Sequence, residues 1–555
     1  MAGGGVPGWE GDNLYYVHSL WWWKHAIFDL HTSPFFDPES FVPAGKNVLR
    51  GEITVANTIP ALPITWLFGA PVAYDVMLLV SFVTTGFFTY LWVTELSGRR
   101  AAGLVAGTVA AFLPYRFAHM AGHLPEMSTQ WAPLALYAFE RFLKRRSLPR
   151  GLFLGAAGAL TVLGCWYYGY ALTLMFPVYV LVRSRGSGVW RTRRWWTGLA
   201  AAAVLGLALV APFLRAMIAL RGESTLHRTL GDMDHWSLNP YDLFIPNLVH
   251  PLYGAAAGRW FPVQQALWVE RGVTLGFVAV ALGIVAVVSF RPRGAVMAIG
   301  TTWIAASLVA LGPTLHWGDR QVRVRLGAHV TALAQRALSG TGGDSADVRA
   351  SLAREGVPVP LPALLMYKFV PLTSSMRVMA RFALWSGYMT AALAGFGVLV
   401  LSARPGAHVR ALTLTAIGLV AFESLATIPG MKLEPRPVDR WLATQPRSAV
   451  IVELPVDQAE RALQDYWMTE NRKPNLFGWV ADSFFPPLQL ERERTLKDFP
   501  SSASIEYLRR SPATYLLVTP AQIPAWPAVQ RALDAAAGLT FQQQFGGVRV
   551  YRIAR

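Results

Sequence analysis

The stretch PVAYDVMLLVSFVTTGFFTYLWVT, residues 71–94, decides the fold of this chain, because it is a long apolar run with a single charged residue, Asp75. A helix of about 20 predominantly apolar residues crosses the roughly 30 Å of hydrocarbon in a bilayer. The whole chain has the same character: 53% of its 555 residues are hydrophobic, 15% are charged, and its mean hydropathy is +0.34. Since soluble proteins carry about 25% charged residues, the composition predicts an integral membrane protein.

Further apolar segments along the chain extend this prediction to a helical bundle. The predicted spans are 71–94, 102–115, 127–142, 151–166, 168–182, 197–214, 272–290, 294–312, 377–401 and 409–428. The second, third, fourth and fifth are short or interrupted by glycine, so the sequence does not define their ends sharply. The pattern therefore predicts a mainly α fold, a polytopic helical membrane bundle of about ten spans.

The charges of the connections between these spans predict their orientation. Alternate connections contain 15 Lys or Arg residues and no Asp or Glu; they are 97–101, 143–151, 183–196, 289–294 and 402–410. The opposite set of connections contains 32 basic and 29 acidic residues; its segments are 1–70, 116–126, 215–271, 313–376 and 429–555. Basic connections face the cytoplasm, so we expect both termini outside. Most of the net charge of +17 would then lie on the cytoplasmic connections, where it anchors the orientation of the spans. We therefore expect no nucleic-acid partner.

The chain divides into two predicted domains. Residues 1–430 form the membrane domain, whose large outer loops, 1–70, 215–271 and 313–376, are rich in Trp, Tyr, Pro and His. Residues 431–555 predict a small extracytoplasmic α/β domain. Its predicted strands are 449–455 and 513–519, its predicted helices lie near 457–470, 503–511 and 525–537, and a hairpin turns at Gly546 and Gly547. Large outer loops beside short inner ones indicate chemistry at the outer membrane surface.

Asp12, in the sequence Gly11-Asp12-Asn13, is the first candidate for that chemistry. A carboxylate at the outer surface could take a proton from a sugar hydroxyl that attacks an activated carbon. The alternative is structural, because Asp is a favoured N-cap and a helix is predicted to start at Leu14.

A second group of candidates occupies the next outer connection. His119, His123 and Glu126 are spaced at i, i+4 and i+7, which places them on one face of a helix. Together with Arg116 they could contact a phosphate or sugar, and the histidines and carboxylate could ligate a divalent metal. The alternative is that they are ordinary polar residues at a helix end near the membrane interface.

Arg377 and Arg381 form the third candidate site, at the outer entrance of the ninth predicted span. Two guanidinium groups four residues apart share a helical face and match a lipid phosphate or diphosphate. The alternative is that both side chains extend to the lipid headgroups, as Arg does at span ends.

The order of these features resembles the GT-C-fold membrane glycosyltransferases, in particular the bacterial branch with a C-terminal extracytoplasmic domain. The matching stretches are GDNLYYVHSLWWWKHAIFDLHTSPFF (11–36), PYRFAHMAGHLPEMSTQWAP (114–133), WYYG (166–169), NPYDLFIPNLVHPLYG (239–254), SSMRVMARFA (374–383), ELP (453–455) and NLFGW (475–479). In this fold a span normally precedes the acidic motif. Only eleven residues precede Asp12, so we expect that an initial span is absent from this sequence or that its start is misassigned.

The resemblance implies a role for each candidate. Members use a polyprenyl-phosphate-linked sugar donor and an acidic residue in the first outer loop, and they invert the anomeric carbon. Asp12 would be the catalytic base, and the other candidates would bind the donor or substrate: Arg116, His119, His123, Glu126, Arg377, Arg381, Lys24 and His25. No cofactor is required. The resemblance leaves open whether a divalent metal, Mg or Mn, binds. The ligands of such a metal would be Asp12, His119, His123 and Glu126.

We therefore expect a multi-pass plasma-membrane glycosyltransferase that transfers a sugar to a hydroxyl of a glycan, lipid or protein acceptor. Membrane lipids would surround it as further partners. Two other classes are compatible with the composition: a lipid or polysaccharide transporter, and a non-catalytic membrane assembly protein.

Overall fold

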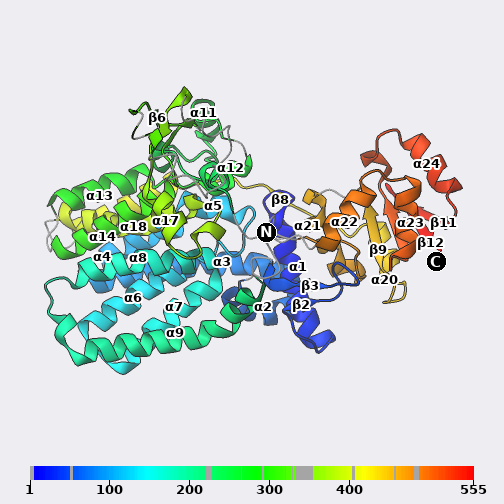
Figure 1. Cartoon of the computed structure of the whole chain (residues 1–555). Helices are drawn as coiled ribbons and strands as arrows, with labels where there is room; N and C mark the ends of the chain where they lie inside the picture. The colour runs from blue at the N-terminus through cyan, green and yellow to red at the C-terminus, as the bar shows by residue number, and fades with distance from the viewer. Residues whose placement is uncertain are drawn as a thin grey trace.

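The chain folds into a bundle of long helices and a smaller α/β unit, with the N-terminal helix between them (Figure 1). The computed structural model describes residues 5–50, 54–220, 228–263, 265–289, 293–318, 320–327, 329, 331–332, 354–402, 407–455, 458–479 and 487–554. The N-terminal helix is α1 (Asp12–Lys24), which continues as a π-helical turn (His25–Asp29) and is followed by α2 (Val55–Phe68). The mainly helical fold class is confirmed.

Each of the ten predicted spans coincides with a helix of the bundle. These helices are α3 (Ala70–Ser97), α4 (Arg100–Ala111), α6 (Trp131–Lys144), α7 (Leu148–Gly164), α8 (Trp166–Ser184), α9 (Arg193–Leu220), α13 (Phe277–Ser289), α14 (Arg293–Ala310), α18 (Ala383–Leu401) and α19 (Ala407–Glu423). Within the described residues, four helical segments are long and apolar enough to cross a membrane: Ala70–Ser97, Arg100–Met120, Arg193–Ile218 and Met379–Leu401. The count of ten crossings therefore stays a prediction.

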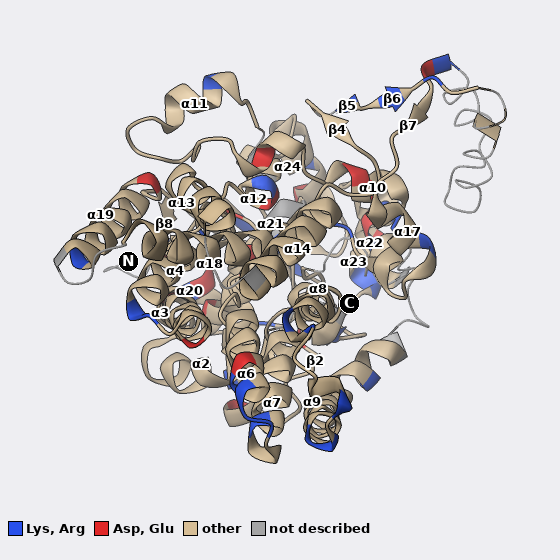
Figure 2. Ribbon diagram, turned by 90° about the vertical axis from the view of Figure 1, so that its left-hand side faces the viewer, with Lys and Arg blue, Asp and Glu red and all other residues tan. Residues whose placement is uncertain are grey.

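Three of the basic connections, 97–101, 143–151 and 183–196, are described throughout, and they lie at the end of the bundle that faces away from α1. The end of α6 contacts that of α3 through Lys144 and Glu95, 2.8 Å apart, and the end of α8 contacts α6 through Arg183 and Glu140, 3.0 Å apart. Figure 2 views this end, where Lys and Arg mark the ends of α6, α7 and α9. The described basic connections and the large loops thus lie at different ends of the bundle, and the cytoplasmic orientation of the basic end stays a prediction.

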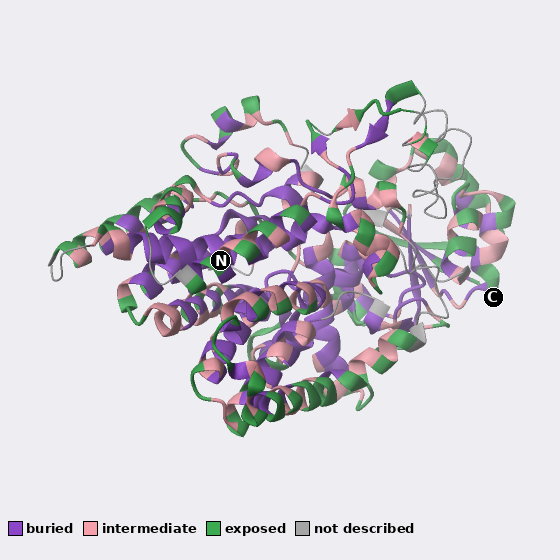
Figure 3. Ribbon diagram, turned by 60° about the vertical axis from the view of Figure 1, so that its left-hand side comes forward, coloured by how far each residue is buried: buried purple, intermediate pink, exposed green. Residues whose placement is uncertain are grey.

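The centre of the bundle is α18, which is buried along most of its length, and exposed residues lie along the outer helices (Figure 3). Close packing elsewhere depends on small residues. Gly151 and Gly155 of α7 face α9 so closely that a Cβ on either would lie 2.4 Å or less from the carbonyl oxygen of Gly198 or Ala202. Small residues allow membrane helices to approach at their backbones.

The large loops form short elements over the other end of the bundle. They are α5 (Pro114–Met120), α10 (Leu230–His235), α11 (Gly254–Trp260), α12 (Gln265–Arg271), α17 (Pro362–Phe369) and the paired strands β4 (His316–Trp317) with β5 (Arg320–Gln321) and β6 (Arg323–Val324) with β7 (Val357–Pro358). In the N-terminal loop β2 (Phe36–Asp37) pairs with β3 (Lys46–Asn47).

The C-terminal unit is a four-stranded mixed sheet with helices, as the sequence predicts. Its strands are β9 (Ile451–Leu454), β10 (Tyr515–Val518), β11 (Leu539–Phe545) and β12 (Val548–Ile553), in the order β11-β12-β10-β9. Only β9 and β10 run parallel. Its helices are α20 (Pro437–Ala443), α21 (Gln458–Asn471), α22 (Pro487–Leu496), α23 (Ser502–Arg510) and α24 (Trp526–Ala535).

The N-terminal segment and the C-terminal unit are interlocked. Strand β1 (Val6–Pro7) pairs with β8 (Gly430–Met431), so the predicted domain boundary at 430/431 falls inside a strand. The backbone N–H of Asn475 donates a hydrogen bond to the Glu39 carbonyl at 2.7 Å. Arg492 donates to the Val42 carbonyl at 2.6 Å. These contacts place the C-terminal unit against the N-terminal segments on both sides of α1.

We expect Gly155→Ala to destabilise the bundle, because the new methyl group would meet the α9 backbone, with Ala202 O at 2.3 Å. Overpacking of this kind costs about 1–3 kcal/mol. The matched control is Gly158→Ala in the same helix, where the nearest atom is a Leu172 side-chain carbon at 3.9 Å. The thermal midpoint in detergent should fall for the first variant only; equal midpoints would contradict the close α7–α9 contact.

Candidate active site

Asp12 is the first residue of α1, and Gly11 occupies the N-cap position. The alternative that Asp12 caps a helix starting at Leu14 is therefore wrong, because the helix begins two residues earlier. Instead, its Oδ1 accepts a hydrogen bond from the Trp479 indole at 3.2 Å, and its Oδ2 lies 3.5 Å from His123 Nε2. The side chain is 41% exposed, so this carboxylate is accessible to a ligand.

The two predicted histidines are brought together by a turn. Helix α5 ends at Met120, so His119 and His123 do not share one uninterrupted helical face, as their spacing predicted. Gly122 and Pro125 in this stretch do not favour a helix. The turn nevertheless brings the Nδ1 atoms of the two histidines to 3.1 Å from each other, and His119 is fully buried.

A buried ion cluster lies behind His123. Arg381 donates from Nε and Nη2 to the two carboxylate oxygens of Glu270, at 2.9 and 2.6 Å, and from Nη1 to Glu126. The Arg381 side chain is 4% exposed and lies over the Tyr167 ring, 4.3 Å from its centroid. His123 Nδ1 lies 3.9 Å from Glu270. Asp12, His123, Glu270 and Arg381 thus form a row of alternating charge, with Asp12 at its exposed end.

The charges in this row shift the pKa values of its members. Burial alone would lower the pKa of His123, but Asp12 and then Glu270 raise it to about 9. Burial alone would raise the pKa of Glu270, but the charge and hydrogen bonds of Arg381 hold it well below its usual range. Because folding raises the His123 pKa from 6.5, the imidazolium contacts stabilise the fold fully below pH 6.5, and this stability is lost as the pH rises through about 9.

Arg377 lies next to this cluster but is not on one helical face with Arg381. A 3-10 turn (Met379–Phe382) precedes α18, so the predicted four-residue helical spacing does not apply here. The Arg377 backbone N–H donates to the Tyr167 hydroxyl at 3.2 Å, and its guanidinium lies 5.0 Å from the Trp236 ring centroid. Both arginines therefore contact Tyr167, one through the ring and one through the hydroxyl.

The structure places three other predicted site residues away from Asp12. Arg116 is fully buried and donates to Thr85 and Ser81 of α3, at 2.7 and 3.1 Å. Lys24 and His25 lie twelve and thirteen residues further along α1 and its continuation, which corresponds to about 18 Å. Their partner there is Asp29, at 2.8 and 2.7 Å.

The predicted metal ligands do not converge on one point. Among the described residues, no group of three or more His, Cys, Asp or Glu side chains is arranged to hold a metal ion. Asp12 approaches His123, whereas Glu126 is engaged by Arg381. These four side chains do not fit a metal, so no step proposed below passes through one.

Two residues of this site were missed by sequence reasoning. Glu270 lies in a segment already predicted as an outer loop, and the adjacent charges Glu270 and Arg271 next to an apolar span were the available signal. Trp479 lies 467 residues from Asp12, and no local pattern connects the two.

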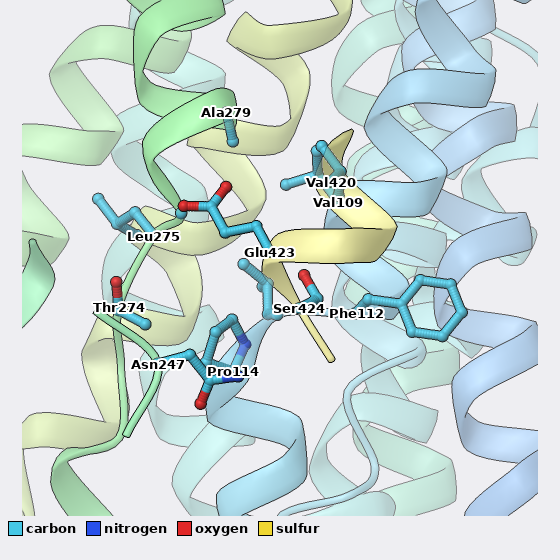
Figure 4. Close-up of a pocket in the computed structure, with 12 residues that line it drawn as sticks. Val109, Phe112, Pro114, Asn247, Thr274, Leu275, Ala279, Val420, Glu423 and Ser424 are labelled. Atoms are coloured by element: carbon cyan, nitrogen blue, oxygen red, sulfur yellow. The ribbon is translucent and has the colours of Figure 1, made fainter. Parts of the chain in front are cut away.

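A separate small pocket lies between α4, α13 and α19 (Figure 4). Phe112, Leu275 and Val420 contribute to its apolar wall. Its one carboxylate is that of Glu423, which accepts hydrogen bonds from the backbone N–H groups of Phe277 and Val278. Since these bonds satisfy the start of α13, we assign Glu423 a structural role.

We expect Asp12→Asn to lower the pKa of His123 from about 9 toward 6.5, because the variant removes the carboxylate that raises it most. Diethyl pyrocarbonate modifies neutral imidazole, so at pH 7.5 modification of His123 should be faster in the variant, as measured by peptide mass spectrometry. Exposed His31 provides the internal control. An unchanged rate at His123 would show that Asp12 does not hold the imidazolium.

Arg381→Met should leave two buried carboxylates without their cation and lower the free energy of unfolding by about 3–5 kcal/mol. Arg377→Met is the matched control, because Arg377 is half-buried and beside an aromatic ring. Unfolding by sodium dodecyl sulfate titration measures the difference. Equal losses in the two variants would refute the structural importance of the ion cluster.

Comparison with known proteins supports the fold. No protein-family model and no curated protein matches the sequence. The structure is similar to that of the arabinofuranosyltransferase AftD from Mycobacteria, with a TM-score of 0.57 and 13% identity over 100% of this chain and 38% of AftD. Lower similarity is found to an oligosaccharyltransferase from Archaeoglobus fulgidus (TM-score 0.48, 11% identity, 99% and 70% covered) and to ArnT from Cupriavidus metallidurans (0.42, 14%, 99% and 94%).

The likeness to AftD, at 13% identity, concerns the fold, and the present chain spans about 38% of the length of AftD. The chain therefore has the fold of the GT-C glycosyltransferases, which are polytopic helical membrane proteins.

Proposed function

We propose that this protein transfers a sugar from a polyprenyl-phosphate-linked donor to an acceptor hydroxyl at the outer face of the membrane, with inversion. One observation carries the proposal: in a GT-C fold, the accessible carboxylate of Asp12 lies at the loop-bearing end of the bundle, within 3.5 Å of His123. An exposed carboxylate beside a row of buried charges is suited to accept a proton in a transfer reaction.

The proposed step forms one bond and breaks one. The acceptor hydroxyl loses its proton to Asp12 as its oxygen attacks the anomeric carbon of the donor. The bond from that carbon to the phosphate oxygen breaks, and the lipid phosphate leaves with the electron pair. Attack from the side opposite the phosphate inverts the anomeric centre. Fixed cations that stabilise the charge on the leaving phosphate supply a large part of the catalysis in such reactions.

We assign the first contact with the donor phosphate to Arg377. Arg377 is half-buried at the edge of the ion cluster, where its backbone N–H donates to the Tyr167 hydroxyl and its guanidinium lies 5.0 Å from the Trp236 ring centroid. Arg381 is already engaged by Glu270 and Glu126, so it could reach a phosphate only by giving up one of these carboxylates. Arg381 would therefore act mainly by holding Glu270 against His123.

The membrane location agrees with the fold and with the apolar helices. We propose that the loop-bearing end and the C-terminal unit are extracytoplasmic, because the basic connections lie at the opposite end. The donor would then approach laterally from the outer leaflet. Its acceptor would be a glycan, lipid or protein with a free hydroxyl.

The test compares Asp12→Asn with Asp29→Asn, a control at the other end of the N-terminal helical segment, where Asp29 pairs with Lys24. Purified protein in lipid nanodiscs is incubated with a panel of undecaprenyl-phosphate-linked pentoses and hexoses and with candidate acceptors, and released undecaprenyl phosphate is measured. Loss of a general base costs about 10²–10⁴ in rate, so Asp12→Asn should lose most of the release and Asp29→Asn should keep it.

Near-normal release by Asp12→Asn would refute the assignment of Asp12. Movement of the intact donor across the bilayer without release would instead favour the transporter alternative.

A further inference from the structure

We propose that the C-terminal unit completes the site, with Trp479 as the residue that positions the Asp12 carboxylate. This inference rests on the proposed function, because it assigns Trp479 a role in the same reaction. It makes the C-terminal unit a part of the active site and not only an appended domain.

The first support is the way in which Asp12 is held. Its two carboxylate oxygens have different partners: Oδ1 accepts from the Trp479 indole N–H at 3.2 Å, and Oδ2 lies 3.5 Å from His123 Nε2. One partner comes from the C-terminal unit and the other from the turn after α5. With a partner on each oxygen, the plane of the carboxylate is fixed while the side chain stays accessible. Hydrogen bonds to a charged group are stronger than those between neutral groups.

The second support is that the indole is itself held in place. Trp479 is 7% exposed, and its ring stacks on Tyr15 of α1 with the ring centroids 4.1 Å apart and the planes at 21°. Its backbone N–H donates to Asp465 of α21 at 3.1 Å. The indole is therefore fixed on one side by the helix that begins with Asp12 and on the other by the C-terminal unit.

The third support is a buried ion pair that joins the same two parts of the chain. Lys46, in β3, lies 3.8 Å from Asp465, and both side chains are buried. The Lys46 ammonium also lies 4.2 Å from the centroid of the Tyr15 ring. Lys46 thus contacts both residues that hold Trp479, so the position of the indole is coupled to the docking of the C-terminal unit.

The test is Trp479→Phe, which keeps an aromatic ring for the stack on Tyr15 but removes the N–H donor. Trp467→Phe is the matched control: it makes the same change at a buried indole of the C-terminal unit whose N–H has no hydrogen-bond partner among the described residues. Three quantities are measured for each variant: donor kinetics by release of undecaprenyl phosphate, the thermal midpoint, and carbodiimide labelling of Asp12 by peptide mass spectrometry.

For Trp479→Phe we expect kcat to fall about ten-fold or more, as for the loss of a hydrogen bond to a charged group, with the donor KM unchanged. Labelling of Asp12 should be faster, because Oδ1 loses its donor, and the thermal midpoint should match that of Trp467→Phe. Trp467→Phe should behave as the wild type in kcat and in labelling.

Equal kcat and equal Asp12 labelling in the two variants would overturn the positioning role. A fall in kcat with unchanged labelling, or with a lower midpoint than the control, would also overturn it, since the cause would then be general destabilisation. If the wild type releases no undecaprenyl phosphate from any donor, the proposed function fails, and the labelling rates alone decide whether Trp479 holds Asp12.

Discussion

The interaction on which the site depends is the buried guanidinium of Arg381 between two carboxylates. It joins three separate parts of the chain: Glu126 from the turn after α5, Glu270 from α12, and Arg381 itself from the turn before α18. An ion cluster with this little exposure costs solvation energy, and it is stable only if all its members are paired and hydrogen-bonded. Since His123 lies beside Glu270, the cluster also determines where an imidazolium can face Asp12.

The site therefore has a rigid interior and an exposed edge. In the interior, Arg381 pairs with Glu126 and Glu270, and Asp12 together with Glu270 raises the pKa of His123 to about 9, so that its imidazole is protonated at neutral pH. At the edge, Asp12 is the member of the row with an accessible side chain. This arrangement places the Asp12 carboxylate where an acceptor hydroxyl could approach. The charged side chains that orient the carboxylate stay buried.

Much of the fold follows from local sequence patterns. The long apolar runs, such as 71–94, became helices, and short β-branched runs, such as 449–455, became strands, because the length and composition of a run are local features of the sequence. The spacing of His119 and His123 correctly indicated proximity, although a turn and not a helix provides it.

The partners of the site residues could not be predicted in the same way. Arg381 was expected to bind a phosphate, but its nearest carboxylate partners come from positions 255 and 111 residues away. The contact of Trp479 with Asp12 depends on how the C-terminal unit docks on α1. Such contacts depend on tertiary packing, and one sequence contains no local signal for them.

A structure determined by electron cryomicroscopy in nanodiscs with added undecaprenyl phosphate tests the central claim most directly. Our account predicts that the lipid phosphate lies at the loop-bearing end, beside Arg377 and facing Asp12 across a space that a sugar would fill. A lipid phosphate bound at the end with the basic connections, or on a face remote from α1, would contradict it.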